Sequence, residues 1–124
     1  MKKQRPVNLQ LNTISFPPTA IVSILHRVSG VGMFVGMVFV IWAWATALQS
    51  SEDFAMVQSI MEGVIGKIIA IGTVSLLIFH VVVGIRHVIM DMGYWEELDS
   101  GNTSAKASIV LWVILTVLAG VAIW

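Results

Sequence analysis

Three long apolar runs, separated by polar segments, set the pattern of this chain. They cover Val28–Leu48, Ile68–Ile85 and Ala107–Trp124. The middle run holds 18 residues without a formal charge. An α-helix of that length extends about 27 Å, close to the roughly 30 Å of a bilayer's hydrocarbon core. The pattern predicts an all-α integral membrane protein with three transmembrane helices, one in each run, forming a single membrane domain over residues 1–124.

Polar segments flank and connect these runs. Residues 1–19 contain all three prolines and predict an irregular N-terminal arm, with the first helix beginning near Thr19. We expect Gln49–Glu62 and Met92–Ala105 to form polar links, and the second helix to extend toward Asp91. The first run has 21 residues, whereas the apolar region of a secretory signal peptide has about 7–15. We therefore expect no cleaved signal.

Composition supports the membrane assignment and limits the chemistry. Hydrophobic residues make up 57% of the chain and charged residues 11%, whereas soluble domains carry about 25% charged residues. Seven basic residues balance seven acidic ones, so the net charge indicates no nucleic-acid partner. The chain has no cysteine, which excludes thiolate metal sites and Cys-ligated iron–sulfur clusters within it.

The basic residues are distributed unequally between the two sides of the predicted helices. Only Lys67 lies at the far side of the second helix. The other six precede the first run or flank the second link: Lys2, Lys3, Arg5, Arg27, Arg86 and Lys106. The positive-inside rule then predicts a cytoplasmic N-terminus and a periplasmic C-terminus. Because residues 1–6 are too short for a transit peptide, we expect a multi-pass protein of the bacterial inner membrane.

His80 lies well inside the second apolar run, where an imidazole without a partner is costly. Gly84, His87 and Asp91 follow it at i+4, i+7 and i+11, which places all of them on one helical stripe. Gly84 leaves a notch between the two imidazoles where a flat group would fit. His80 and His87 are about 10.5 Å apart along the helix axis and cannot bind the same iron. His80 suits an axial haem ligand, and His87 suits a propionate contact nearer the aqueous boundary.

Polar residues also share one face of the first helix, at the same cytoplasmic rim. Ser23, His26 and Arg27 fall at i, i+3 and i+4. A hydroxyl, an imidazole and a guanidinium there suit a carboxylate, such as a haem propionate, or a quinone carbonyl. Gly32 and Gly36 have the spacing that permits close helix approach, although glycine is also simply common in membrane helices.

These residues alone leave several interpretations open. His80 could hydrogen-bond only to protein, and Arg27, Arg86 and Lys106 could be no more than positively charged flanks. A proton-coupled transporter would need a carboxylate within a span, which the three runs lack. A self-contained dihaem cytochrome would need more deep histidines, and a cofactor-free anchor would purify without colour. The pattern by itself indicates a small membrane subunit with a candidate haem or quinone site.

Three segments, taken together, favour one of these interpretations. They are Arg5–Leu9 (RPVNL), Ser23–Gly30 (SILHRVSG) and His80–His87 (HVVVGIRH), the last followed by Asp91. The combination of Ser-x-x-His-Arg-x-Ser with His-x-x-x-Gly-x-Arg-His resembles the cytochrome b membrane-anchor subunit of bacterial succinate dehydrogenase, respiratory complex II. The resemblance covers essentially the whole chain, including its length and its three spans.

The resemblance implies a four-subunit assembly. In it, a flavoprotein subunit oxidises succinate, an iron–sulfur subunit relays electrons, and two anchor subunits hold haem b and ubiquinone. His80 would be one axial ligand of the haem iron, and the second anchor subunit would supply the other. His26, Arg27 and His87 would contact the haem propionates, while Ser23 and Arg27 would line the ubiquinone site. The chain would then help to pass electrons to ubiquinone in the tricarboxylic acid cycle and respiratory chain, without contributing the succinate site.

Overall fold

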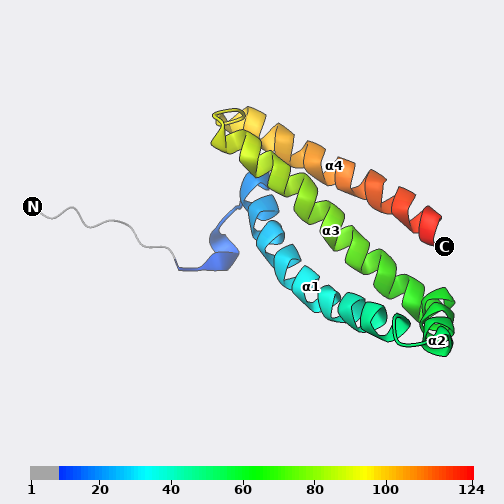
Figure 1. Ribbon diagram of the computed structural model, residues 1–124. Coiled ribbons are helices and arrows are strands. Elements are labelled where there is room, and N and C mark those ends of the chain that lie inside the picture. The colour runs from blue at the N-terminus through cyan, green and yellow to red at the C-terminus, as the bar shows by residue number, and fades with distance from the viewer. Residues whose placement is uncertain (1–8) are drawn as a thin grey trace, which may run out of the picture.

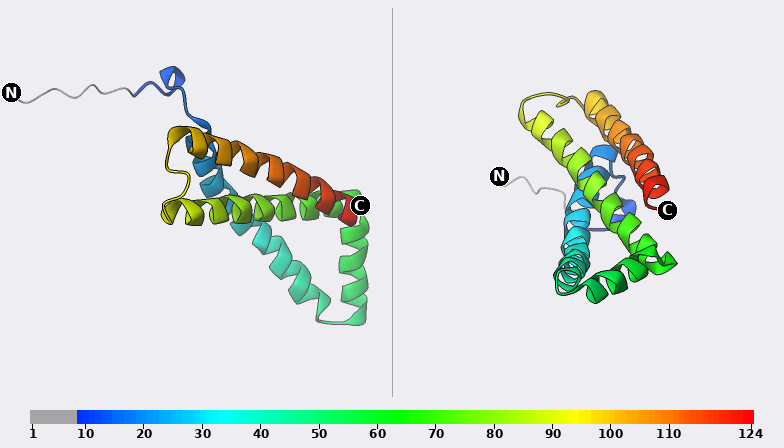
Figure 2. Two further views of the ribbon diagram at one scale, coloured as in Figure 1. Left: turned by 90° about the horizontal axis from the view of Figure 1, so that it is seen from above. Right: turned by 45° about the vertical axis from the view of Figure 1, so that its right-hand side comes forward.

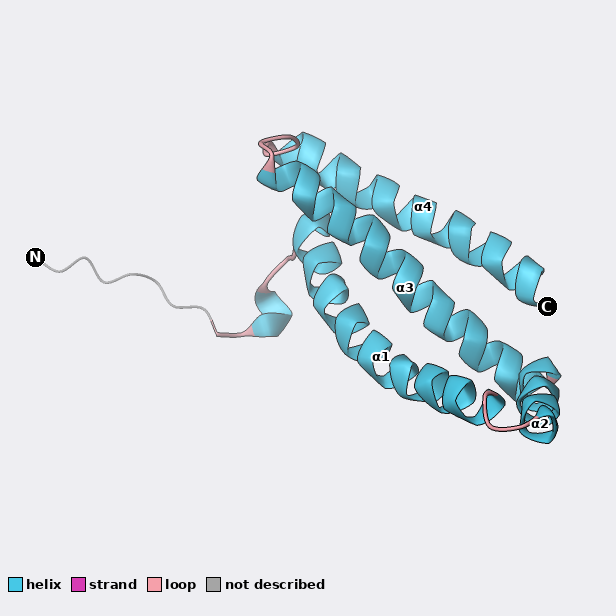
Figure 3. Cartoon of the chain, viewed as in Figure 1, coloured by secondary structure: helices cyan, strands magenta, loops and turns pink. Residues whose placement is uncertain are grey.

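The structure is a computed structural model in which residues 9–124 are described. Those residues form only helices, turns and loops, so the all-α prediction is confirmed (Figures 1 and 3). The elements are a 3-10 turn and four α-helices: Leu11–Thr13, α1 Pro18–Ala47, α2 Ser51–Glu62, α3 Val64–Asp91 and α4 Leu98–Ile123. By length and composition, α1, α3 and α4 are each able to cross a membrane, as the three apolar runs predicted. The segment Arg5–Asn8 lies outside the described residues.

The helix ends follow local chain chemistry. α1 begins at Pro18, one residue before the expected start, because proline is tolerated in the first turn of a helix. α3 continues to Asp91 as expected. Gly93 ends it with a φ of 89°, a left-handed conformation that glycine adopts without steric cost.

Both predicted polar links are wrong in part, because each contains helix. Gln49–Glu62 includes the 12-residue helix α2. The Ser50 hydroxyl caps this helix by accepting a hydrogen bond of 3.0 Å from the main-chain N–H of Asp53. Met92–Ala105 is irregular only before Leu98, where α4 begins. Its first two turns are polar, so the apolar run predicted the span but not the start of the helix.

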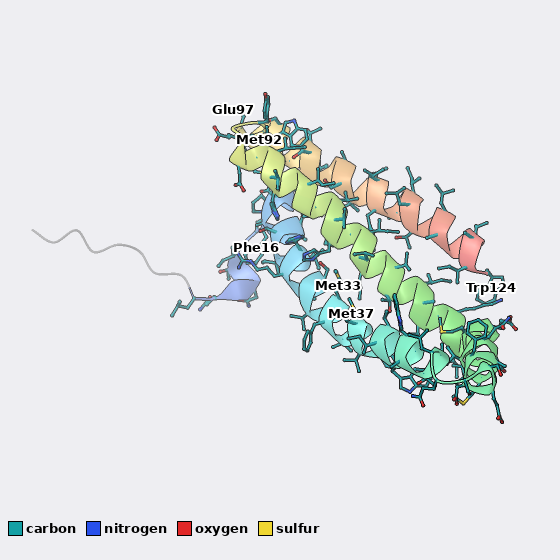
Figure 4. All side chains as sticks on the ribbon, viewed as in Figure 1. Phe16, Met33, Met37, Met92, Glu97 and Trp124 are labelled. Atoms are coloured by element: carbon teal, nitrogen blue, oxygen red, sulfur yellow. The ribbon has the colours of Figure 1, made fainter. Side chains whose placement is uncertain are left out.

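The helices are arranged around α3, which packs along both α1 and α4 (Figures 1 and 2). α2 lies across the gap between the end of α1 and the start of α3 (Figure 2). Phe16, Met92 and Glu97 lie toward one end of the molecule and Trp124 toward the other (Figure 4). At that other end, Lys67 Nζ donates to the main-chain oxygen of Trp124 at 2.8 Å.

The core of the described residues is small and lies where α1, α3 and α4 meet. Val22, Phe79, Val83 and Ala105 are buried there, with Ile109 and Trp112 packed against them. Most other large apolar side chains are exposed on the outer faces of the helices (Figure 4). A surface of this kind requires lipid or neighbouring transmembrane helices.

Arg86 is more than a positively charged flank. Its side chain is only 3% exposed. Its Nε donates to Ser104 Oγ at 2.9 Å, and one terminal nitrogen donates to the Gly101 carbonyl at 3.1 Å. Both acceptors belong to the start of α4, so Arg86 ties α4 to α3. Lys106, by contrast, is exposed.

The glycine pair of α1 permits a close approach to α3. A Cβ added at Gly36 would lie 3.0 Å from Thr73 Cγ2, and one added at Gly32 would lie 2.8 Å from Leu76 Cδ1. A side chain at Gly36 would therefore require Thr73 to give way by a few tenths of an ångström, and one at Gly32 would require the end of Leu76 to shift. The close-packing interpretation of the glycine spacing is therefore the correct one here.

Replacing Gly36 by leucine should separate α1 from α3. Overpacking of this kind costs about 1–3 kcal/mol, and we expect a lower unfolding temperature for the detergent-extracted protein. The matched control is Gly72→Leu, since a Cβ at Gly72 meets nothing within 4 Å. Equal unfolding temperatures for the two variants would contradict the packing described here.

Candidate functional site

Residues from α1 and α3 line a cavity of about 390 Å³. α1 supplies Ser23, His26 and Arg27 from its second and third turns, because i, i+3 and i+4 positions share a helix face. α3 supplies the others from its last two turns. The complete lining is Ser23, His26, Arg27, His87, Met90 and Asp91. The structure thus brings together four of the five residues that the sequence singled out for cofactor or quinone contacts.

His80, the fifth, lies about two turns of α3 deeper than His87 and does not line this cavity. Its side chain is half-buried. Its Nδ1 atom lies 3.0 Å from Ser29 Oγ, which α1 contributes. Nε2 has no hydrogen-bond partner among the described residues. It is not buried either, because the one buried side-chain polar atom without a partner among these residues is Asn102 Oδ1. The second ring nitrogen of His80 is therefore accessible from outside the chain.

His26 fills the notch that Gly84 was expected to provide for a flat group. A Cβ at Gly84 would lie 3.4 Å from His26 Nε2. That nitrogen lies 3.1 Å from the main-chain oxygen of His80. Since a carbonyl can only accept, Nε2 of His26 donates, and its ring is anchored to the backbone of α3.

The three imidazoles form a continuous group from the rim toward the interior. The His26 and His80 rings are stacked, with centroids 3.9 Å apart and an interplanar angle of 21°. His87 meets His26 edge-on, with a centroid distance of 5.0 Å. His26 therefore sits between the two histidines of α3 and connects the cavity to the deeper ring.

The donor set matches a haem better than a bare metal ion. Among residues 9–124, no group of three or more His, Cys, Asp or Glu side chains could hold a metal. A haem iron needs fewer protein ligands than a bare metal ion, because the porphyrin supplies four ligands and a single imidazole can bind the iron from this chain. The accessible Nε2 of His80 meets this requirement. Arg27 and the rim histidines offer donors of the kind that carboxylates accept.

Sequence reasoning missed the role of Ser29. Ser29 belongs to the motif Ser23–Gly30. The one sign of a role within the sequence was its position three residues after His26, on the same helix face. Its partner lies 51 residues away on α3. No pattern within one helix identifies a contact between two helices.

Comparison with known proteins decides the family. The model of the family described as Succinate dehydrogenase/Fumarate reductase transmembrane subunit matches residues 1–119. The chain belongs to this family. With the three membrane-spanning helices, this membership makes it a multi-pass protein of the bacterial inner membrane and a subunit of an enzyme complex.

Individual relatives agree with the family. The chain is 40% identical over 126 residues to the succinate dehydrogenase cytochrome b556 subunit of Coxiella burnetii, with 100% of both chains covered. It is 32% identical over 114 residues to the protein of that name from Paracoccus denitrificans, covering 92% of this chain and 88% of the relative. The Rickettsia felis protein of the same name is 25% identical over 115 residues, covering 93% of this chain and 90% of the relative. The predicted resemblance to a bacterial cytochrome b anchor subunit is confirmed.

Proposed function

We propose that the chain is, over its whole length, the cytochrome b anchor domain of a succinate dehydrogenase, holding haem b and forming part of a ubiquinone site. The relatives' names support the enzyme and the cytochrome. The observation that carries the haem assignment is the His80 imidazole, deep in a membrane-spanning helix, whose Nε2 is accessible and has no hydrogen-bond partner within residues 9–124. A polar nitrogen at that depth needs a ligand.

The haem is shared in this proposal. His80 would hold the haem iron from this chain, and the second anchor subunit would supply the other protein ligand, since His26 and His87 are engaged with each other near the rim. When bound, haem b supplies one-electron transfer. Arg27 and His87 would hold the propionates as donors. His26 would join them only as an imidazolium, with a proton on Nδ1, because its Nε2 proton is used on the His80 carbonyl and a carboxylate can only accept.

Ubiquinone enters the cavity beside the iron–sulfur subunit. Ser23 donates a hydroxyl hydrogen bond to a quinone carbonyl, and Arg27 stabilises negative charge as the quinone is reduced. Succinate oxidation in the flavoprotein subunit releases two electrons and two protons, and reduction of ubiquinone takes up the same number. The chain thereby contributes to electron delivery but not to the succinate site.

The remaining partners follow from the exposed surface. Three spans with so small a core leave apolar helix faces for the second anchor subunit and for lipid. We place the N-terminus in the cytoplasm, beside the iron–sulfur and flavoprotein subunits, and the C-terminus in the periplasm. Support comes from the cavity, which lies at the helix ends that carry Arg27 and Arg86, whereas Lys67 lies at the other end.

The haem assignment is tested by His80→Leu in the assembled complex. We expect loss of the b-type reduced-minus-oxidised absorbance, because leucine offers no lone pair to iron. Co-purification of all four subunits and succinate oxidation by an artificial dye are the controls for assembly. A wild-type spectrum in this variant would remove His80 as a ligand.

The quinone assignment is tested by Ser23→Ala and Arg27→Leu. Each should lower succinate–ubiquinone reductase activity about tenfold or more, since a preorganised donor to a charged oxygen is lost. Succinate oxidation by an artificial dye should be unchanged. The matched control is Lys106→Leu, which removes an exposed cation of α4 outside the cavity lining. Equal losses in both assays would point to failed assembly, whereas unchanged ubiquinone reduction in both variants would contradict a specific quinone role.

The orientation is tested with reporters. Alkaline phosphatase folds to an active form only in the periplasm, so a fusion after Trp124 should be active. The same reporter inserted between Met92 and Leu98, in the link between α3 and α4, should be inactive. The reverse result would invert the topology.

A further inference from the structure

Ser29 occupies an unusual position between two histidines. Its side chain is 3% exposed. Its hydroxyl donates to the main-chain oxygen of His26 at 2.7 Å and lies 3.0 Å from Nδ1 of His80. A serine hydroxyl has one proton to donate and lone pairs to accept. Both capacities of Ser29 are used.

This arrangement fixes which nitrogen of His80 carries the proton. Because the Ser29 proton goes to the His26 carbonyl, Oγ must accept the hydrogen bond from His80. Nδ1 of His80 is therefore protonated. In a neutral imidazole the other nitrogen, Nε2, then bears the free lone pair. That nitrogen is the accessible one without a partner among the described residues.

The surroundings prevent the ring from turning away. His26 stacks on one face of His80, with ring centroids 3.9 Å apart. Gly30 packs close to the same ring, since a Cβ there would lie 3.3 Å from His80 Cε1. The hydrogen bond that His80 donates to Ser29 thus involves a ring whose position is already confined by α1.

We propose that Ser29 is a positioning residue for haem binding: its hydroxyl holds His80 in the Nδ1–H tautomer, so that Nε2 is presented to iron with increased donor strength. The inference rests on the proposed role of His80 as axial ligand. Hydrogen bonds from the second nitrogen of a metal-bound histidine fix the tautomer and raise ligand basicity. A more basic ligand favours the ferric over the ferrous state.

The test compares hydroxyl-containing with hydroxyl-free residues at position 29 in the assembled complex. Ser29→Ala removes the acceptor, and Ser29→Cys keeps nearly the same size with a weakly accepting sulfur. Ser29→Thr retains a hydroxyl. The matched control is Ser108→Ala, because Ser108 is 8% exposed and donates within α4 to the Ser104 carbonyl. The readouts are the haem midpoint potential, the electron paramagnetic resonance g values of the ferric haem, and haem content per complex.

We expect the alanine and cysteine variants to weaken the preference for ferric over ferrous haem about tenfold, which equals the lower bound of the loss in metal affinity or activity when an outer-shell partner of a ligating histidine is removed. This corresponds to a rise of about 59 mV in midpoint potential for a one-electron couple. Their g values should shift in parallel. Ser29→Thr and Ser108→Ala should resemble the wild type. If the alanine and cysteine variants lose haem from an assembled complex while the threonine variant keeps it at the wild-type potential, the proposal is equally supported.

Other results would overturn it. Unchanged or lowered potentials in Ser29→Ala and Ser29→Cys would show that the hydroxyl does not increase donor strength. A threonine variant that behaves like alanine would assign Ser29 to packing alone. Both results presuppose a haem that disappears in His80→Leu. Retention of haem in that variant would instead overturn the proposed function itself, so the two failures are distinguishable.

Discussion

The crossing of α1 and α3 depends on satisfying polar groups inside a lipid environment. Hydrocarbon offers no water to an imidazole or a hydroxyl, so each must find a partner within protein or cofactor. Here the Ser29 hydroxyl of α1 accepts a hydrogen bond from the His80 ring on α3, and the His26 ring donates one to the main-chain oxygen of His80. The glycines one and two turns further along α1 allow the helices to approach closely enough for these bonds. Packing and polar satisfaction therefore specify the same geometry.

A second set of polar contacts joins α3 to α4 and stabilises the opposite side of the site. Arg86 reaches the start of α4, while Trp112 donates to the Ser75 carbonyl and hydroxyl nearer the far end. α3 is thus held from both sides by partners spaced along its length. α3 is therefore tied to α4 at two levels, near its end at Arg86 and further along at Ser75.

The sequence predicted those parts of the structure that depend on periodicity within one segment. Apolar runs predicted three spans, and i, i+3 and i+4 spacing predicted that Ser23, His26 and Arg27 share a face, which the cavity confirms. Contacts between segments were not predictable in this way. Nothing within α3 alone indicated that His26 would occupy the space beside Gly84, or that Arg86 would be buried against α4. The whole of α2 and the polar start of α4 were missed, because capping and polar helical turns leave no apolar signal.

The two imidazole nitrogens of His80 have different surroundings, which fits the proposal that this chain provides one half of a shared site. One nitrogen is committed to Ser29 within the chain, and the other is left available at the surface of the helix pair. A side chain that completed both bonds internally would be satisfied and inert. A side chain with neither bond would be costly in the bilayer and free to rotate. The bond from Nδ1 to Ser29 orients the ring, and Nε2 is left accessible for the haem iron of the proposed function.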